Sequence, residues 1–486
     1  MNEAATRLEP NAVWTHFEEL NAVPRPSKKE GRVIEFMKQF GEGLNLETIV
    51  DDIGNVIIRK PATPGMEDRQ GVILQGHLDM VHQKNADTVF DFETEGIRSI
   101  ITDDGWLTAE GTTLGADNGM GVASIMAVLS ATDIEHGQVE ALFTIDEETG
   151  MTGAFKLQPG VLTGSILLNT DTEDEGELCI GCAGGIDTNI NANYEQVPTG
   201  DGTAFKVSVK GLRGGHSGCE IHLGRGNANK IMNRLLWDGS KNFGLRIASL
   251  DGGSLRNAIP RESFAVVVVD SDQADHFKKH IAETIGVIQT ELIRTEPELM
   301  VSIEPASPVE TVMDSTSQEN LIRAVYAAPC GVARMSDEMP GLVETSTSLA
   351  RVLVESGTVL VQFLTRSSVE TARDDLARTI ESAFQLAGAD VKHSGGYPGW
   401  KPNADSEILR QMTQIYSDLF GVEPTVNAVH AGLECGIIGS VYPGLDMISF
   451  GPTIKNPHSP DEKCEIASVK KYWDYLVATL RQIPTK

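Results

Sequence analysis

The sequence is poor in basic residues and has no long apolar run. Its 486 residues contain 40 lysines and arginines against 69 aspartates and glutamates, a formal net charge of −29 at pH 7. A surface of that sign repels the phosphate backbone of nucleic acids and anionic membranes. No segment approaches the roughly 20 consecutive apolar residues that a membrane-spanning helix requires. We therefore expect no nucleic-acid partner, no membrane contact and a cytoplasmic location.

Cysteine is also scarce, and its spacing predicts no disulfide framework. The six cysteines are scattered along the chain. Cys179 and Cys182 form one C-x-x-C pair, but a zinc ribbon needs a second pair at a suitable spacing. We expect ordinary reduced thiols. A thiol oxidoreductase built on this pair remains a minor alternative.

Several hydrolase signatures are absent as well. The chain has no H-E-x-x-H, no G-x-S-x-G and no G-x-x-x-x-G-K-[ST]. These absences exclude zinc held by two histidines of one helix, a serine nucleophile on a sharp turn and ATP hydrolysis of the P-loop type.

The first part of the chain alternates strands with helices. Apolar runs at 72–74, 139–145 and 165–169 predict buried strands, and residues 120–131 predict a helix that is apolar nearly all round. This alternation is typical of an α/β fold with a mixed, mostly parallel sheet flanked by helices.

The pattern changes in the middle of the chain and then returns. After residue 186, apolar and polar residues alternate, which indicates antiparallel strands covered on one face. An apolar strand at 447–450 restores the α/β pattern. We expect a discontinuous catalytic domain of residues 1–186 and 397–486, and an inserted α+β lid domain of residues 187–396, which could consist of two α+β halves.

Polar side chains with metal-binding chemistry follow the predicted strands. His77 and Asp79 stand at i and i+2, so an extended backbone directs both to one side. In a parallel sheet, functional sites lie beyond the carboxyl ends of the strands. Any one of these acids fits an ordinary surface acid in so acidic a chain, but their coincidence at several strand ends does not. The candidates are His77, Asp79, Asp117, Glu147, Glu148, Asp171 and the late His458.

Imidazole and carboxylate groups suit zinc, and a catalytic zinc keeps one position for water. Two ions about 3.5–4 Å apart can activate a water and hold a scissile carbonyl, which is the two-metal mode of hydrolysis. One carboxylate must then bridge the ions, and Asp117, flanked by glycines after a turn, suits that position.

The motifs as a group resemble the dinuclear zinc exopeptidase and deacylase family that includes carboxypeptidase G and the carnosinases. They are HLD at 77–79, GADNG at 115–119, EE at 147–148, GGHSG at 214–218 and RNAIP at 256–260. Within this family the whole chain most closely resembles the bacterial aminoacyl-histidine dipeptidases. That likeness is carried by GTTLGADNG at 111–119, GCAGGID at 181–187, HAGLECG at 430–436 and PHSPDE at 457–462.

The resemblance implies a complete ligand set for two zinc ions per subunit. His77 and Asp171 would hold one ion, and Glu148 and His458 the other. Asp117 would bridge both, and the family often has a cis peptide directly after this residue. Cobalt and manganese suit the same ligands.

The resemblance also implies three catalytic residues. Glu147 would be the general base that takes a proton from the attacking water. Asp79 would hydrogen-bond a ligating imidazole and fix its tautomer. His216 would stabilise the tetrahedral oxyanion. The alternative for His216 is an ordinary turn histidine among glycines.

Three further residues are candidates for substrate binding. Asn257 and Arg366 would hold the substrate carboxylate, the arginine because its planar fork grips a carboxylate in two places. A solvated charge at a strand end is the alternative for Arg366. Glu434 would meet a free amino group.

The resemblance thus predicts a two-zinc dipeptidase for short, unblocked peptides, most of all Xaa-His dipeptides including β-alanyl-histidine. We expect a small peptide substrate and a homodimer, since two-fold dimers are the commonest closed assembly. A deacylase or tripeptidase with the same metals is one alternative. A zinc-binding scaffold without catalysis is another.

Overall fold

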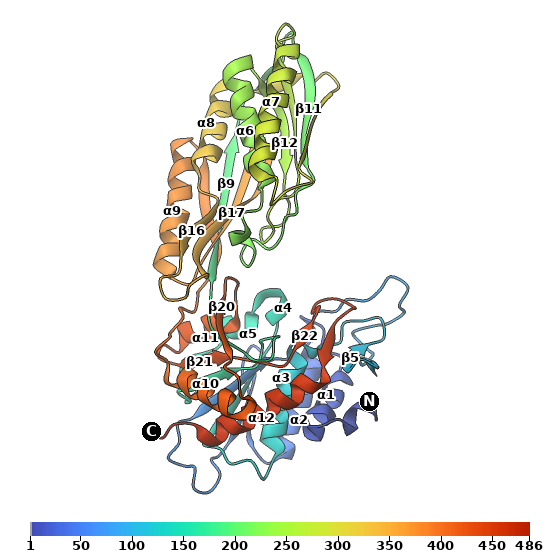
Figure 1. The fold of residues 1–486 in the computed structure, drawn as a ribbon, viewed down its shortest axis with the longest axis vertical. Helices are drawn as coiled ribbons and strands as arrows, with labels where there is room; N and C mark the ends of the chain where they lie inside the picture. The colour runs from blue at the N-terminus through green and yellow to red at the C-terminus, as the bar shows by residue number, and fades with distance from the viewer. Residues whose placement is uncertain (1) are drawn as a thin grey trace. The chain divides into compact units, whose positions relative to one another are not determined.

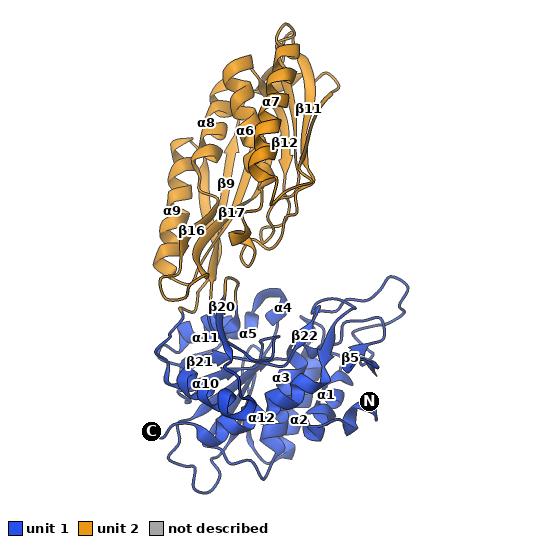
Figure 2. Cartoon of the chain, viewed as in Figure 1, with its two compact units in different colours: residues 1–181, 402–428, 433–486 blue, residues 182–401, 429–432 orange. Residues whose placement is uncertain are grey.

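We describe residues 2–486 in a computed structural model (Figure 1). They form two compact units (Figure 2). Unit 1 contains the described residues up to Gly181 together with Pro402–Ala428 and Leu433–Lys486, and unit 2 contains Cys182–Lys401 and Val429–Gly432. The sequence pattern predicts divisions after residues 186 and 396, whereas the units divide after residues 181 and 401.

An eight-stranded sheet forms the centre of unit 1. In order across the sheet, its strands are β1 (Glu47–Val50), β2 (Val56–Lys60), β6 (Val139–Thr144), β3 (Val72–His77), β7 (Ile166–Asn169), β21 (Asp446–Ser449), β8 (Glu177–Cys182) and β20 (Thr425–Val429). The four central strands, from β6 to β21, pair in parallel. The pairs β1 with β2, β2 with β6 and β21 with β8 are antiparallel.

Helices flank this sheet, as Figure 1 shows. They are α1 (Asn11–Asn21), α2 (Gly31–Gly43), α3 (Ala116–Ser130), α4 (Glu147–Gly150), α5 (Thr152–Lys156), α10 (Glu407–Phe420), α11 (Glu434–Val441) and α12 (Ile466–Gln482). Every residue of β3, β6 and β7 is buried, as expected where helices cover both faces of parallel strands. The predicted fold class, a mixed and mostly parallel α/β sheet, is confirmed.

A second, four-stranded sheet of unit 1 is not predicted by the sequence pattern. Its order is β22 (Ile454–Lys455), β23 (Lys463–Glu465), β5 (Trp106–Ala109) and β4 (Ser99–Ile101). These strands are too short for a clear alternation, and they pair segments from opposite ends of the chain. The loop between β22 and β23 carries His458, so this small sheet anchors that histidine to unit 1.

Unit 2 is built on one antiparallel sheet of nine strands. The order is β14 (Met300–Pro305), β11 (Thr203–Lys210), β13 (Ser263–Val269), β12 (Arg246–Gly252), β17 (Val343–Glu355), β18 (Thr358–Ser367), β9 (Gly184–Asn193) and β19 (Asp390–Tyr397), with β16 (Gly331–Met335) also on β17. The additional short strands β10 (Gln196–Pro198) and β15 (Thr311–Met313) pair with each other.

Four α-helices complete unit 2: α6 (Ala228–Phe243), α7 (Ala274–Leu292), α8 (Ser315–Ala327) and α9 (Glu370–Leu386). Figure 1 shows them together along the sheet. They share one apolar core with the sheet, which includes Phe205 and Phe277 from one end and Phe363 and Phe384 from the other. The two α+β halves that the sequence suggests are therefore the two ends of one continuous sheet, joined where β12 pairs with β17.

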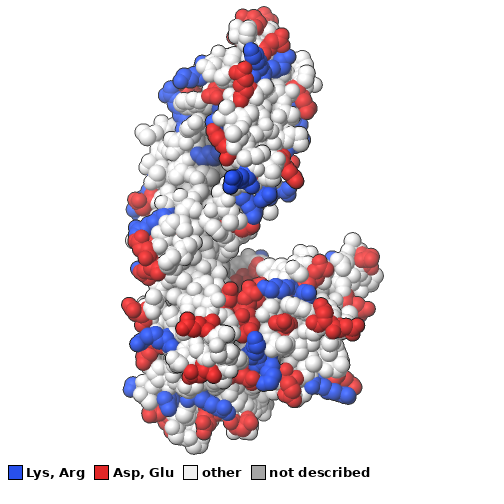
Figure 3. Space-filling view, in the orientation of Figure 1, with Lys and Arg blue, Asp and Glu red and all other residues white. Residues whose placement is uncertain are grey.

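The surface carries charges of both signs on each unit, with several acidic side chains side by side on unit 1 (Figure 3). Among residues 2–486, no helix has both the length and the apolar composition needed to cross a lipid bilayer.

The close approach of α3 to the end of β7 yields a stability prediction. A Cβ atom at Gly121 would lie 2.8 Å from the carbonyl oxygen of Thr170 and nearer still to its hydroxyl. Because backbone atoms cannot move aside easily, we expect Gly121→Ala to lower the free energy of unfolding by about 2 kcal/mol. Thermal and urea unfolding would measure the change.

Gly43 in α2 is the matched control, since a Cβ atom there meets nothing within 4 Å. Gly43→Ala should leave stability unchanged or raise it slightly, because alanine favours helix. Equal stabilities of the two variants would contradict the close packing of α3 on Thr170.

Candidate active site

The carboxyl ends of the central strands bring one imidazole and two carboxylates together. His77 is the last residue of β3, and its Nε2 atom lies 3.1 Å from Asp117 Oδ1 and 3.3 Å from Asp171 Oδ1. Asp171 follows β7 by two residues, and Asp117 lies in the first turn of α3. His77 is 1% exposed. These three residues form the first group of candidate metal ligands.

A second imidazole approaches the same aspartate from the other side. His458 Nε2 lies 3.1 Å from Asp117 Oδ2 and 3.0 Å from Glu148 Oε2. The two oxygens of Asp117 thus face different histidines. The peptide bond after Asp117 is cis, as the resemblance predicts. Asp117, Glu148 and His458 form the second group of candidate ligands.

The donor chemistry fits a pair of divalent cations. In each group the candidate ligand atoms lie within 4.8 Å of one another. Glu148 Oε1 is buried and has no hydrogen-bond partner among residues 2–486, so it has a free lone pair to offer. Four carboxylates, those of Asp117, Glu147, Glu148 and Asp171, surround two imidazoles, and cations would balance this excess of negative charge.

The pKa values of these residues reflect the close packing of the carboxylates and imidazoles. Burial raises the pKa of Asp171 to about 6, with His77 acting against the rise and Asp117 adding to it. Burial also raises the pKa of Glu147 well above its usual range. Hydrogen bonds to Asp117 and Glu148 raise the pKa of His458 to about 11. A metal ion must therefore displace protons to bind here.

Glu147 and Glu148 begin α4, directly after β6, and Asp79 caps their backbone. The Asp79 carboxylate accepts hydrogen bonds from the N–H groups of Glu147 at 3.0 Å and Glu148 at 3.3 Å. His77 Nδ1 lies 3.1 Å from the Asp79 carbonyl oxygen, but 3.5 Å from its carboxylate. The imidazole is thus oriented mainly by the backbone of Asp79, whereas the resemblance implies the side chain.

Glu434 is buried beside this cluster at the start of α11. Its Oε2 atom accepts hydrogen bonds from Gln75 Nε2 and Thr144 Oγ1, both at 2.7 Å. Its Oε1 atom is buried without a partner among the described residues. Burial raises the pKa of Glu434 to about 7. The side chain therefore has one acceptor oxygen available for a ligand.

His216 belongs to unit 2, in the loop that follows β11. Its Nδ1 atom accepts hydrogen bonds from the N–H groups of Gly218 at 3.2 Å and Cys219 at 3.0 Å. Burial and the charge of Arg366 lower its pKa. The ring is therefore neutral at pH 7, with its proton on Nε2. That N–H is a fixed donor, which suits an oxyanion.

Arg366 lies on β18 of the same unit and is 4% exposed. Its Nη1 atom donates to Tyr397 Oη at 2.8 Å, and its Nη2 atom lies 3.5 Å from His216 Nε2. Because both facing groups are donors, they do not bond to each other but can share one acceptor. Asn257 is exposed, and its carbonyl oxygen accepts from the Ser217 N–H at 2.8 Å.

The predicted site residues thus fall into two sets. Unit 1 brings together His77, Asp79, Asp117, Glu147, Glu148, Asp171, Glu434 and His458, and unit 2 holds His216, Asn257 and Arg366. In unit 2 the side chains of His216 and Arg366 lie next to each other. Asn257 contacts the loop that carries His216 through its backbone carbonyl group.

Three buried residues near these sets received no role from the sequence. Arg25 and Glu462 bond to the segments that carry His77 and Asp117. His430 of unit 2 bonds Ser346 Oγ at 2.7 Å, and burial lowers its pKa to about 3. His430 and Glu462 lie inside the motifs at 430–436 and 457–462, so the sequence marks both as candidates for a functional role. No motif marks Arg25, and a single arginine between helices is usually exposed.

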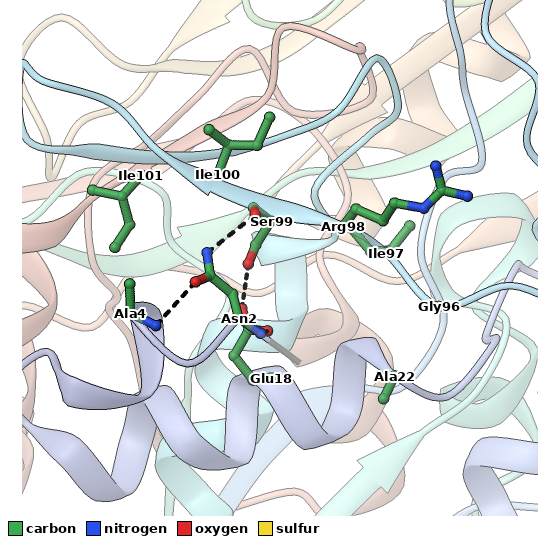
Figure 4. A pocket seen from close by; sticks show the side chains of 10 residues that line it. All are labelled: Asn2, Ala4, Glu18, Ala22, Gly96, Ile97, Arg98, Ser99, Ile100 and Ile101. Atoms are coloured by element: carbon green, nitrogen blue, oxygen red, sulfur yellow. Dashed lines mark hydrogen bonds between the residues drawn. The ribbon is translucent and has the colours of Figure 1, made fainter.

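A cavity of unit 1 contains none of these residues. It measures about 740 Å³ and lies between α1 and residues 96–101 (Figure 4). Glu18 within it accepts hydrogen bonds from the Asn2 N–H and from the Ser99 hydroxyl. Its buried carboxylate is thus already paired, and this cavity is not the candidate active site.

The geometry can be compared with known proteins. The model of peptidase family M20/M25/M40 matches residues 73–482. A cytosol non-specific dipeptidase of Escherichia coli is 43% identical over 483 residues, 99% of each chain. The crystal structure of aminoacylhistidine dipeptidase from Vibrio alginolyticus is 45% identical, with a TM-score of 0.94, and the match covers 99% of this chain and 98% of that one.

A tripeptidase from Staphylococcus aureus shares the fold at 16% identity and a TM-score of 0.57, with 98% of this chain and 99% of that chain covered. The resemblance stated from the motifs is confirmed by the full-length matches. The chain belongs to peptidase family M20/M25/M40.

Proposed function

We propose that the chain is a metal-dependent dipeptidase that hydrolyses short peptides with free termini, most of all Xaa-His dipeptides including β-alanyl-histidine. The observation that carries this proposal is Asp117, whose two oxygens face His77 and His458 as a carboxylate between two metal ions would. Full-length similarity to a non-specific dipeptidase and to an aminoacylhistidine dipeptidase supports the substrate class.

The proposed cofactor is two zinc ions per subunit, one at His77, Asp117 and Asp171 and one at Asp117, Glu148 and His458. Imidazole nitrogens and carboxylate oxygens are common zinc ligands, and cobalt or manganese suits the same set. When bound, such ions would polarise the scissile carbonyl and lower the pKa of the water that attacks it.

Glu147 is the proposed general base. It stands next to Glu148 at the start of α4, and the N–H groups of both residues donate to the Asp79 carboxylate, which fixes the direction of this turn. Burial raises its pKa, so it holds a proton more readily than an exposed glutamate does. It takes the proton from the attacking water and delivers it to the leaving amine.

Unit 2 supplies the proposed donors to the substrate. The Nε2–H of His216 stabilises the oxyanion of the tetrahedral intermediate, because the Gly218 and Cys219 N–H groups hold the opposite nitrogen as an acceptor. Arg366 and Asn257 bind the C-terminal carboxylate. The neighbouring donors of His216 and Arg366 favour a substrate with negatively charged oxygens.

Glu434 is the proposed partner of the substrate's free amino group. Its unpaired Oε1 atom can accept from an ammonium, which an N-acyl amino acid lacks. This difference favours a dipeptidase over a deacylase. We also infer a cytoplasmic location, in line with the name of the E. coli relative, and a homodimer, which sedimentation of the purified chain would test.

The central test is hydrolysis by purified protein that has been stripped of metal and titrated with zinc. We expect cleavage of β-alanyl-histidine and alanyl-histidine to appear as zinc approaches two equivalents. Alanyl-alanine and an N-acetyl amino acid complete the substrate panel. Cleavage of the acetyl substrate alone would replace the dipeptidase with a deacylase, and no cleavage at all would favour a zinc-binding scaffold.

Replacing the general base should remove turnover without removing metal. Glu147→Gln keeps the size of the side chain but cannot take a proton, so we expect kcat to fall about 10²- to 10⁴-fold. Bound zinc and thermal stability should match the native protein. Glu148→Gln is the contrasting variant, because it should lose zinc as well. Native turnover in Glu147→Gln would exclude this residue as the base.

The carboxylate site can be tested by a change in KM. Arg366→Lys keeps the charge but loses the planar fork, so we expect KM for alanyl-histidine to rise about tenfold or more. The C-terminal amide of the same dipeptide should be little affected. Arg351→Lys is the control, since Arg351 pairs with Asp251 on the same sheet. Equal effects on both substrates would argue against carboxylate binding by Arg366.

A further inference from the structure

The carboxylate of Glu462 occupies an unusual position behind the turn that carries Asp117. It is 2% exposed and accepts hydrogen bonds from four consecutive N–H groups. The distances are 2.7 Å from Leu114 and 3.0 Å from Gly115 to Oε2, and 2.7 Å from Ala116 and 3.3 Å from Asp117 to Oε1. Successive N–H groups that converge in this way form a pocket for an anion, filled here by the chain's own side chain.

Arg25 binds a carbonyl group of the same turn, whereas Glu462 binds its N–H groups. It lies between α1 and α2 and is 1% exposed. Its Nη2 atom donates to the Gly115 carbonyl oxygen at 2.6 Å, and its Nη1 atom lies 3.2 Å from the carbonyl oxygens of both Leu78 and Asp79. One guanidinium therefore links the Asp117 turn to the segment that follows His77.

Glu462 connects the turn to a third segment. It lies four residues after His458, in the loop between β22 and β23, so the same loop supplies a candidate metal ligand and the support behind Asp117. The three segments that carry His77, Asp117 and His458 are thus joined by two buried charged side chains. Burial of these charges is sustained by their many hydrogen bonds and by their opposite signs.

We propose that Glu462 and Arg25 are positioning residues that set the spacing of His77, Asp117 and His458 before any metal binds. Glu462 fixes the backbone of Asp117 relative to His458, and Arg25 fixes it relative to His77. The inference rests on the proposed two-metal function, because donor atoms must stand within about 0.5 Å of their working positions to bind two ions in sequence.

Because of the position of Glu462, its replacement should affect the two candidate metal sites unequally. The Glu462→Gln variant would retain one acceptor oxygen but would turn an NH₂ group toward two backbone N–H donors. Two of the four hydrogen bonds to this turn would therefore be lost. The affected turn and loop carry Asp117 and His458. The group of Asp117, Glu148 and His458 should therefore weaken more than the group of His77, Asp117 and Asp171.

The test compares Glu462→Gln with Glu140→Gln in the full chain. Glu140 is also buried in unit 1, is 1% exposed, and accepts from the N–H groups of Thr163 at 2.8 Å and Gly164 at 2.7 Å. Zinc is titrated into the metal-free protein by calorimetry, and hydrogen exchange of residues 114–117 is followed by mass spectrometry without metal. Unfolding temperatures are recorded for each variant.

We expect Glu462→Gln to weaken one of the two zinc equivalents about 10- to 100-fold and to leave the other nearly unchanged. Exchange at residues 114–117 should accelerate in the metal-free variant. Glu140→Gln should lower the unfolding temperature without changing either zinc step or this exchange. If Glu462→Gln behaves like Glu140→Gln, the residue is merely structural and the proposal is overturned.

Arg25→Lys is the second variant, in case Glu462→Gln does not fold. Lysine keeps the charge but cannot reach Gly115 and Leu78 together, so both zinc equivalents should weaken. Native zinc affinities with a lower unfolding temperature would overturn the role of Arg25. Because zinc binding and exchange are measured without substrate, a native protein that binds zinc but cleaves no dipeptide would refute the proposed function alone.

Discussion

The burial of several carboxylates around two imidazoles is the constraint on which the site depends. Asp117, Glu148 and Asp171 lie within 3.3 Å of a histidine nitrogen, in a region from which water is largely excluded. The carboxylates of such a cluster repel one another in a low dielectric, and the two histidines offset only part of the negative charge. The fold therefore has to hold these groups against their repulsion. It does so with short connections from strands whose residues are all buried.

A layer of buried polar side chains beneath the cluster serves the same purpose. Gln75 donates to Thr144 and accepts from Asn169, and Asn169 in turn accepts from the Asp171 N–H and the Ser449 hydroxyl. These bonds cross four adjacent parallel strands, from β6 to β21. A buried network of this kind is rigid when its members are satisfied. It fixes the strand ends relative to one another, and hence the spacing of the groups they carry.

The sequence predicts the fold and the candidate metal ligands because both have local signatures. Apolar runs mark β3, β6 and β7, and motifs mark His77, Asp117 and His458. The sheet of β4, β5, β22 and β23 has no such signature, since its strands have only two to four residues. The proposed roles of Arg25 and Glu462 have no local signature either. Their partners are backbone groups far away in the sequence, and a sequence does not reveal which backbone groups lack a hydrogen bond.

The two units differ in the sign of the ligand group that each can bind. In unit 1, Glu434 offers an unpaired carboxylate oxygen. In unit 2, His216 Nε2 and Arg366 Nη2 are donors 3.5 Å apart that can bind negatively charged oxygens. In the proposed function, a dipeptide with free termini provides both kinds of group, an ammonium and a carboxylate. A blocked terminus would leave a buried charged group unpaired, and such groups reject the wrong ligand more strongly than a missing apolar contact does.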